Sequence, residues 1–274
     1  SKVCIIDSYC IPVCILKHKK DLFILQIWHS IGKIKKSGYQ TLKVSSGRDE
    51  KLAKLMCMHK NYTKIIAGGK AFDKFYEEGF NTSKDKLLHY GLPRIDYLLK
   101  NEKKFKEEIL KKYPEFKNKK VVYYVPTFRT YDVNGPRKMF KKYKKEDFIL
   151  IVRPHPNQQI KCTNKNIYNC QEFKNLELLA IADYVITDYS SICLEAAILN
   201  KKVFFYVYDY EKYMKDNGIN LDPTKTLPTC TSKNIEDLFK IIKNDSYDNE
   251  SYEKFRKSYL PKNLGKSTKL ITDY

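Results

Sequence analysis

The chain has 274 residues, and its 42% hydrophobic and 14% aromatic content allows a large folded core and excludes a disordered polymer. Its formal net charge of +20 is spread along the chain and predicts an anionic partner: a phosphorylated substrate, an anionic lipid surface or a nucleic acid. A general preference for lysine over arginine is an equally good explanation of this excess, since arginine is the usual residue of bidentate phosphate recognition.

The cysteines and the hydropathy pattern bear on the cellular compartment. The eight cysteines show no metal-site spacing and mostly lie in apolar runs, which favours reduced, buried thiols in a cytosolic protein. No apolar run approaches the ~20 residues that span a bilayer, and no signal peptide is recognisable. Because the chain begins directly with a strand-like run, we expect an N-terminal segment to have been removed.

Strand-like and helical patterns alternate through the first part of the chain. The strand-like runs are Val3–Ile6, Leu22–Ile27, Lys64–Ala67 and Lys86–Tyr90, and the helical runs are Glu50–His59 and Lys70–Glu78. Residues 99–119 are a Lys/Glu-rich amphipathic helix with a polar end. We place the domain junction there, which gives domains 1–104 and 105–274.

The second part repeats this alternation. Its strand-like runs are Lys120–Val125, Asp147–Val152, Asn166–Asn169, Tyr184–Thr187 and Lys202–Val207; Leu176–Ile181, Ser190–Leu199 and three patterns in 233–274 are helical. Near-continuous apolar strands between helices predict parallel sheets covered on both faces. Two such units in tandem predict an α/β fold of two Rossmann-like domains that face a cleft.

Ligands of open α/β sheets bind beyond the carboxyl ends of the strands, so the residues after each strand are the candidates. His29 follows the second strand-like run and is succeeded by Gly32 and a basic run, which favours a base near a phosphate over a structural histidine. Arg153 and His155, each followed by proline, leave the Asp147–Val152 strand, where they suit an anionic oxygen; an ordinary turn is the alternative.

The segment after Tyr184–Thr187 combines a turn with the start of a helix. Asp188, Ser190 and Ser191 lie there, and hydroxyl groups beside a helix N-terminus favour an anion site, although a plain serine cap is the alternative. Glu195, one turn into that helix, is placed to accept from a ribose hydroxyl. The P-loop-like Gly265-Lys266-Ser267-Thr268 is discounted because no strand precedes it. There is no Asp-x-Asp pair, and the other histidines lie in or beside apolar segments.

These segments together resemble the CDP-glycerol glycerophosphotransferase family of teichoic acid synthesis. The similar boxes are Gln26–Gly32 (Q-x-W-H-G), Gly91–Asp96 (G-x-P-R-x-D), Pro126–Arg129 (P-T-F-R), Arg153–Pro156 (R-x-H-P), Thr187–Ser191 (T-D-Y-S-S) and Phe204–Lys212 (F-Y-x-Y-D-x-E-x-Y). They follow one another in order from Gln26 to Lys212. The chain departs from the pattern at Ser30, Glu195 and Thr229, and the last departure leaves the choice of polyol open.

The resemblance implies a GT-B fold and a transfer of glycerol phosphate from CDP-glycerol to an undecaprenyl-linked glycan acceptor at the cytoplasmic face of the membrane, where the enzyme is peripheral. His29 is then the general base, and His155 and Arg153 hold the pyrophosphate or the leaving CMP. Asp188, Ser190, Ser191 and Glu195 bind the donor, with Arg129 and Arg94 as supporting cations. No cofactor and no metal is required, because these cations and the helix dipole supply positive charge.

Three alternatives remain open at this point. CDP-ribitol is an alternative donor, and a GT-B glycosyltransferase that uses a nucleotide sugar shares the fold and the phosphate site. A basic module without catalysis, which binds membrane or nucleic acid, is disfavoured by the ordered His and Arg residues at strand ends. Nucleic acid is further disfavoured because no reader motif is present.

Overall fold

The computed structural model describes residues 2–158, 160, 162 and 164–274, and the chain divides into two compact units. Unit 1 comprises Ser1–Asp96, Glu211–Leu221 and Ser258–Tyr274, and unit 2 comprises Tyr97–Tyr210 and Asp222–Lys257. The sequence-based division at 104/105 falls inside helix α4 (Pro93–Lys112). The sequence analysis did not anticipate that two later segments return to unit 1.

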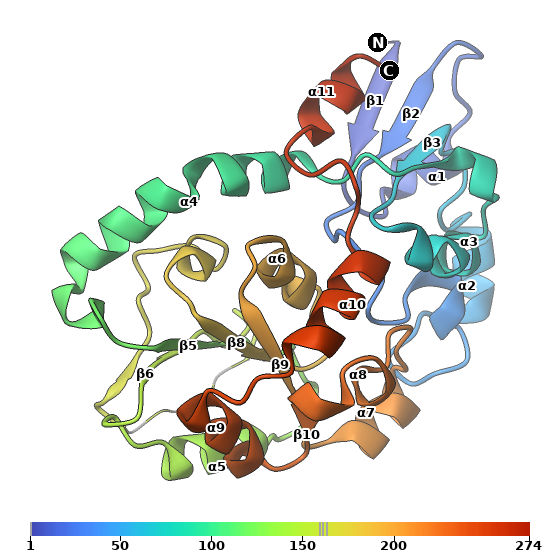
Figure 1. Ribbon diagram of the computed structural model, residues 1–274. Coiled ribbons are helices and arrows are strands. Elements are labelled where there is room, and N and C mark those ends of the chain that lie inside the picture. The colour runs from blue at the N-terminus through green and yellow to red at the C-terminus, as the bar shows by residue number, and fades with distance from the viewer. Residues whose placement is uncertain (1, 159, 161, 163) are drawn as a thin grey trace. The chain divides into compact units, whose positions relative to one another are not determined.

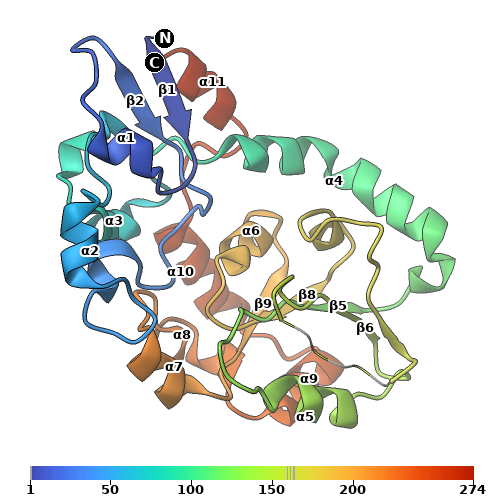
Figure 2. The same cartoon turned by 180° about the vertical axis from the view of Figure 1, so that it is seen from behind.

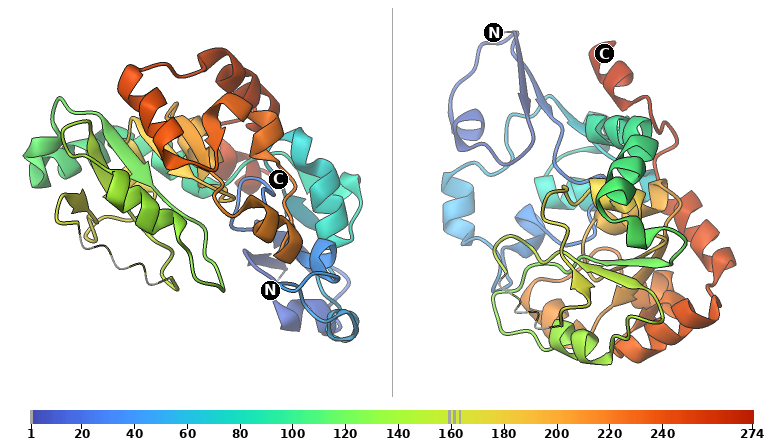
Figure 3. Two further views of the ribbon diagram at one scale, coloured as in Figure 1. Left: turned by 90° about the horizontal axis from the view of Figure 1, so that it is seen from below. Right: turned by 90° about the vertical axis from the view of Figure 1, so that its left-hand side faces the viewer.

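Unit 1 is built on a four-stranded parallel sheet in the order β1-β2-β3-β4. The strands are β1 (Val3–Ile6), β2 (Phe23–Gln26), β3 (Lys64–Ile66) and β4 (Leu87–Leu88). The helices are α1 (Ile11–Ile15), α2 (Glu50–Leu55), α3 (Asp73–Phe80) and α11 (Ser267–Thr272), together with the first turn of α4. Helices α1 and α11 lie on opposite sides of β1 and β2 (Figures 1 and 3).

The predicted strands of unit 1 are confirmed, but the predicted helix Glu50–His59 is too long. α2 ends at Leu55 because the backbone then turns through two residues with positive φ, Cys57 at 46° and His59 at 60°. Only local hydrogen bonds in the turn set this end, and the helical spacing of apolar residues does not reveal them. Helix α1 has five residues and was not predicted.

Unit 2 is built on a six-stranded parallel sheet in the order β10-β9-β8-β5-β6-β7. The strands are β5 (Val121–Tyr124), β6 (Ile149–Val152), β7 (Ile167–Tyr168), β8 (Tyr184–Thr187), β9 (Lys202–Tyr206) and β10 (Thr231–Ser232). Every residue of β5, β6 and β8 is buried, which is why these strands read as continuous apolar runs. The parallel sheet of unit 2 was predicted from these runs, and that of unit 1 from the strand–helix alternation in the first part of the chain.

Helices cover both faces of the unit 2 sheet. They are α5 (Gly135–Lys142), α6 (Ile192–Ile198), α8 (Pro223–Thr226), α9 (Ile235–Asn244), α10 (Asn249–Tyr259, to Lys257 in this unit), the start of α7 (Tyr210–Asp216) and the rest of α4. α5 and α9 lie side by side on one face, and α6 lies on the other (Figures 1 and 2). Short 3₁₀ helices span Gly38–Thr41, Lys70–Phe72, Lys84–Lys86, Pro114–Phe116, Glu177–Ala180 and Pro228–Cys230.

Helix α5 was missed in the sequence because it begins with Gly135 and Pro136, which are typical of turns. A Cβ atom at Gly135 would lie 2.2 Å from the ring of Tyr208, so the glycine is required by close packing. Proline at the first turn of a helix lacks only an N–H that has no partner within the helix. The two residues that indicate a turn therefore mark a helix start.

Candidate active site

His29 stands in unit 1 on a turn that follows β2, and buried hydrogen bonds fix this turn. Trp28 has a φ of 56°, which is uncommon for a bulky residue. Its N–H donates to Oε1 of Gln26 at 2.8 Å, and Nε2 of the same, fully buried Gln26 donates to the carbonyl of Ser8 at 2.9 Å. Gln26, the glutamine of the Q-x-W-H box, thus holds the strained turn at Trp28, and this turn exposes His29.

The hydrogen bonds of His29 define its tautomer. Nδ1 lies 3.0 Å from the carbonyl oxygen of Asp7, which follows the neighbouring strand β1, and a carbonyl can only accept. Nδ1 therefore carries the proton, and Nε2 of the neutral ring keeps a lone pair. The side chain is exposed, and its ring centroid is 4.2 Å from that of Trp28. This arrangement suits a general base.

The basic run behind His29 divides into inward and outward side chains. Lys33 is only 3% exposed, whereas Lys35 and Lys36 are exposed. The backbone of this run pairs with a segment that returns to unit 1, since Lys36 N–H donates to the carbonyl of Gly218 at 3.2 Å. The run that the sequence presented as one phosphate loop therefore offers one buried and two exposed cations.

Arg94, the other candidate in unit 1, is half-buried in the first turn of α4, and burial lowers its pKa. Asp96 in the same box accepts from the N–H groups of Ser267 (3.1 Å) and Thr268 (2.7 Å) at the start of α11. The Gly265–Thr268 segment is thus a helix start held by a carboxylate, which agrees with its rejection as a P-loop.

The remaining candidates belong to unit 2, where the ends of β5, β6, β8 and β9 share one edge of the sheet. Arg129 lies at the centre and is 3% exposed. Its guanidinium donates to Asp188 at 2.9 Å and to Asp209 at 2.6 and 3.1 Å, and Nη1 donates to the Thr127 carbonyl at 2.9 Å. Burial lowers the pKa of Arg129, but the carboxylates of Asp188 and Asp209 raise it by more, so the net shift is upward. Arg129 therefore ties three strand ends together.

Asp188 is 1% exposed and has several donors besides Arg129. Its carboxylate accepts from the N–H of Thr127 at 3.0 and 3.1 Å and from the N–H of Tyr189 at 2.6 Å. Arg129 and Asp188, both predicted to bind substrate, are each other's partners. The structure thus gives them a contact within the protein.

Asp209 belongs to the same cluster, and the sequence analysis did not single it out. It follows β9, and its carboxylate accepts hydrogen bonds from Arg129 and from the hydroxyl of Tyr131, the latter at 2.6 Å. The Phe204–Lys212 box contained it, but nothing local distinguishes this aspartate from Glu211 two residues later. Only the pairing with Arg129, 80 residues earlier, identifies it.

Arg153 and His155 follow β6 at the same edge. Nη1 of Arg153 donates to the carbonyls of Cys170 and Phe173, both at 2.8 Å, so part of this guanidinium organises the backbone after β7. His155 is exposed, its ring centroid is 5.5 Å from that of Phe128, and Nδ1 accepts from the N–H of Asn157 at 3.2 Å. In the neutral ring the proton is then on Nε2, the opposite tautomer to His29.

The two serines and Glu195 surround the start of α6. Ser190 and Ser191 are half-buried, and Oγ of Ser190 accepts from the N–H of Ile192 at 3.4 Å. Glu195 is 3% exposed within α6. Of the predicted site residues, His29 and Arg94 belong to unit 1; unit 2 brings Arg129, Arg153, His155, Asp188, Ser190 and Ser191 to the carboxyl edge of one sheet, with Glu195 in the adjoining helix.

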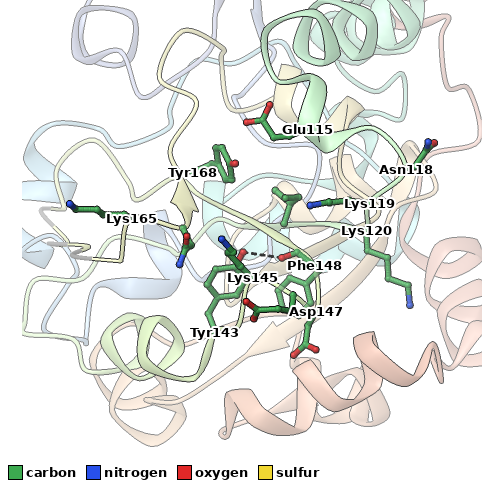
Figure 4. Close-up of a pocket in the computed structure, with 13 residues that line it drawn as sticks. Glu115, Asn118, Lys119, Lys120, Tyr143, Lys145, Asp147, Phe148, Lys165 and Tyr168 are labelled. Atoms are coloured by element: carbon green, nitrogen blue, oxygen red, sulfur yellow. Dashed lines mark hydrogen bonds between the residues drawn. The ribbon is translucent and has the colours of Figure 1, made fainter.

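A cavity of about 590 Å³ in unit 2 lies at the opposite edge of the sheet, before β5, β6 and β7 (Figure 4). Lysines and acidic residues line it together, and the Tyr143 hydroxyl donates to the carbonyl of Phe148 at 2.9 Å. Asp147 in its wall is paired with Lys243 at 2.9 Å. None of the predicted site residues lines this cavity.

Two further properties concern metals and membranes. Within the described residues, no three His, Cys, Asp or Glu side chains gather so that they could hold a metal ion. A search of the same residues for a helix of sufficient length and hydropathy to cross a bilayer finds none. All eight cysteines are free thiols.

Known proteins with similar sequences are named for teichoic acid synthesis. A teichoic acid poly(ribitol-phosphate) polymerase of Bacillus spizizenii is 29% identical over 293 residues, which cover all of this chain and 46% of that protein. A teichoic acid ribitol-phosphate primase of the same species is 27% identical, over all of this chain and 74% of that protein. A teichoic acid glycerol-phosphate primase of Bacillus subtilis is 29% identical over 80% of this chain and 59% of that protein. The chain thus spans only about half the length of some of these relatives.

Solved structures show the same fold. The wall teichoic acid polymerase TagF, in a variant soaked with CDPG, superposes with a TM-score of 0.80 at 22% identity, over 99% of this chain and 71% of that one. UDP-GlcNAc 2-epimerase from Neisseria meningitidis bound to UDP-GlcNAc gives a TM-score of 0.62 at 15% identity, over 99% and 75%. The predicted GT-B-like α/β class is confirmed. Residues 1–274 match the family described as CDP-Glycerol:Poly(glycerophosphate) glycerophosphotransferase, and the chain belongs to this family, as its boxes from Gln26 to Lys212 predict.

Proposed function

We propose that the protein transfers glycerol phosphate from CDP-glycerol to a hydroxyl group of a lipid-linked acceptor and releases CMP. Family membership over the whole chain supports this reaction class. The observation that carries the proposal is the His29 turn, which offers an imidazole lone pair at a strand end. CDP-ribitol is the alternative donor, because the relatives named for ribitol phosphate are as similar as the one named for glycerol phosphate.

The proposed reaction is an in-line phosphoryl transfer. The acceptor oxygen attacks the glycerol-linked phosphorus, the bond from this phosphorus to the bridging oxygen breaks, and CMP leaves with that oxygen. Nε2 of His29 takes the proton of the acceptor hydroxyl. Such a reaction depends on positioning and charge stabilisation, and a general base contributes about 10²–10⁴-fold.

The donor is assigned to unit 2. His155 offers an Nε2–H group that can donate to a phosphate oxygen, and the hydroxyls of Ser190 and Ser191 add two more donors. Arg153 supplies charge beside them while it holds the loop after β7. Glu195 stays the candidate that accepts a hydrogen bond from a ribose hydroxyl. Because Glu195 is buried, that hydroxyl must lose its water on binding.

Arg129 and Asp188 receive a different role from the one that the sequence suggested. Their side chains are buried and bonded to each other. We infer that they hold the strand ends that present the donor-binding groups and do not contact the donor. Arg94 remains a supporting cation, now with a half-buried position in unit 1.

The acceptor and the location are the broader part of the proposal. We propose an undecaprenyl-linked glycan acceptor and a peripheral position on the cytoplasmic face of the membrane. The net charge of +20 supports this position, because anionic lipid headgroups attract exposed lysines. A role in nucleic acid binding is not proposed.

The decisive experiment measures nucleotide release in the presence of a lipid-linked acceptor: CMP from CDP-glycerol or CDP-ribitol, and UDP from UDP-GlcNAc. We expect release from a CDP-polyol, a loss of about 10²–10⁴-fold in His29→Ala, and little change in CDP-glycerol affinity measured by calorimetry. His18→Ala is the matched control, because His18 belongs to the same unit and bonds to the Val13 carbonyl. Full turnover in His29→Ala would remove this residue from the mechanism. Turnover of UDP-GlcNAc with none of either CDP-polyol would establish a glycosyltransferase instead.

A further inference from the structure

Lys33 is a buried cation in a cage of aromatic rings. Its Nζ lies 4.1 Å from the ring centroid of Phe80, 5.5 Å from that of Trp28 and 5.7 Å from that of Tyr76. It donates to Oγ of Ser37 at 2.7 Å. Among the residues that the structure describes, no carboxylate lies within ion-pair distance of this ammonium group. A buried charge without an ionic partner is costly, so its place at the base of a functional turn requires an explanation.

The walls of this cage belong to the turn that carries His29. Trp28 is the residue of this turn with positive φ. Besides Lys33, its ring neighbours the His29 ring, with 4.2 Å between the two ring centroids. The hydroxyl of Tyr76 donates to the carbonyl of Ser30 at 3.2 Å, on the other side of His29. A cation held by these rings therefore acts on the turn both before and after the histidine, through attraction to the ring faces.

We propose that Lys33 is a positioning residue whose caged ammonium group holds the Trp28 turn in the conformation that presents His29. The proposal deepens the proposed function and rests on it where it concerns catalysis. Lys33 does not contact substrate in this scheme, since its side chain is 3% exposed. The cage is fitted to the ammonium group: a Cβ atom at Gly79 would lie 2.5 Å from Nζ.

The charge of Lys33 can be varied near neutral pH, because burial lowers its pKa to about 7. The neighbouring groups do not titrate in the same range. Burial and the charges of Lys33 and Arg48 lower the pKa of His59 to about 3, and burial raises the pKa of Tyr76 well above 10. Lys35 and Lys36 on the same segment are exposed, so mutation of Lys33 can assign a change that occurs near pH 7.

The first test uses Trp28 as the probe, because it is the sole tryptophan of the chain. Its fluorescence is recorded from about pH 5.5 to 9 in His29→Ala, which removes the adjacent imidazole. We expect a transition with a midpoint near 7, and we expect Lys33→Met in the same background to abolish it. An emission that does not change with pH in His29→Ala, or that titrates equally without Lys33, overturns the proposed contact.

The second test separates positioning from stability. Lys33→Met should lower turnover of the CDP-polyol about tenfold or more, because small misplacements of a catalytic group are costly, while donor affinity and the melting temperature stay unchanged or rise. Wild-type turnover should lose the contribution of the ammonium group as pH rises above about 7, and Lys33→Met should lack this alkaline dependence. Lys51→Met, on the exposed side of α2, is the control without effect. Wild-type turnover in Lys33→Met overturns the positioning role. Full activity of His29→Ala would instead show that His29 is not the general base. In that case the fluorescence test would still decide whether Lys33 controls the turn.

Discussion

Replacing Arg129 by methionine tests whether this guanidinium holds the fold or the donor. The change leaves the carboxylates of Asp188 and Asp209 without their cation, and Asp188 is 1% exposed. Removal of one partner from a buried ion pair costs about 3–5 kcal/mol, because the remaining charge stays uncompensated. Since a domain is stable by about 5–15 kcal/mol, we expect a large fall in the free energy of unfolding of unit 2.

The assay is urea denaturation at neutral pH, followed by circular dichroism because unit 2 contains no tryptophan. Arg137→Met is the matched control: Arg137 and Asp132 form an ion pair in the same unit, but their side chains are 59% and 72% exposed, so we expect a loss of about 0–1 kcal/mol. Asp209→Asn should lose less alone and show a strong coupling with Arg129→Met in a double-mutant cycle. A stable Arg129→Met protein with weakened CDP-glycerol binding would refute the structural role and restore Arg129 as a donor-binding residue.

The remaining predictions concern Lys33, Gly135 and the membrane. Burial lowers the pKa of Lys33 from 10.5, the ordinary value of a lysine side chain, to about 7, so between these limits the unfolded chain binds one more proton and stability rises with pH. Relative to Lys33→Met, the free energy of unfolding of wild-type unit 1, followed by Trp28 fluorescence, should increase by up to about 1.4 kcal/mol per pH unit from about pH 7.5 to 9.5. An unchanged difference between the two proteins would contradict the burial of a charged lysine. Gly135→Ala should destabilise unit 2 by about 1–3 kcal/mol in the same denaturation assay, because its Cβ meets the Tyr208 ring; a neutral effect would show that this ring can move aside. Binding to anionic vesicles should weaken steeply as salt rises, because exposed charges are screened within about 8 Å at physiological ionic strength; salt-insensitive sedimentation with vesicles would point to apolar insertion.

The parts of the fold that the sequence predicted well are those in which local pattern and tertiary environment coincide. β5, β6 and β8 are buried on both faces, so their apolar runs needed no knowledge of their neighbours. His29 was singled out for a related reason, since it comes two residues after the apolar run Leu22–Ile27. Asp7 holds the His29 ring and Gln26 holds the Trp28 turn, and the partner that follows β1 could not be read from the spacing alone.

The parts that the sequence did not predict depend on contacts between distant residues. Arg129 and Asp188 each suggested a ligand contact because each was considered without the other, although they lie 59 residues apart and share a hydrogen bond. The extent of unit 1 also depends on contacts between residues that are distant in the sequence. Asp96 begins the contact with Ser267, 171 residues later, and no local signal indicates that the C-terminal segment returns.

The opposite tautomers of the two candidate histidines lead to an expectation about pH. Nδ1 of His29 donates to a carbonyl, so protonation of the ring removes its only basic atom and ends its action as a base. Nδ1 of His155 accepts from a backbone N–H, so protonation there ends this hydrogen bond, but it leaves the Nε2 donor in place and adds positive charge beside the proposed phosphate site. Acidification should therefore impair proton removal and spare donor binding. The measurement is turnover and CDP-glycerol affinity on the two sides of neutral pH, and a loss of affinity in parallel with turnover would contradict the separate roles of the two histidines.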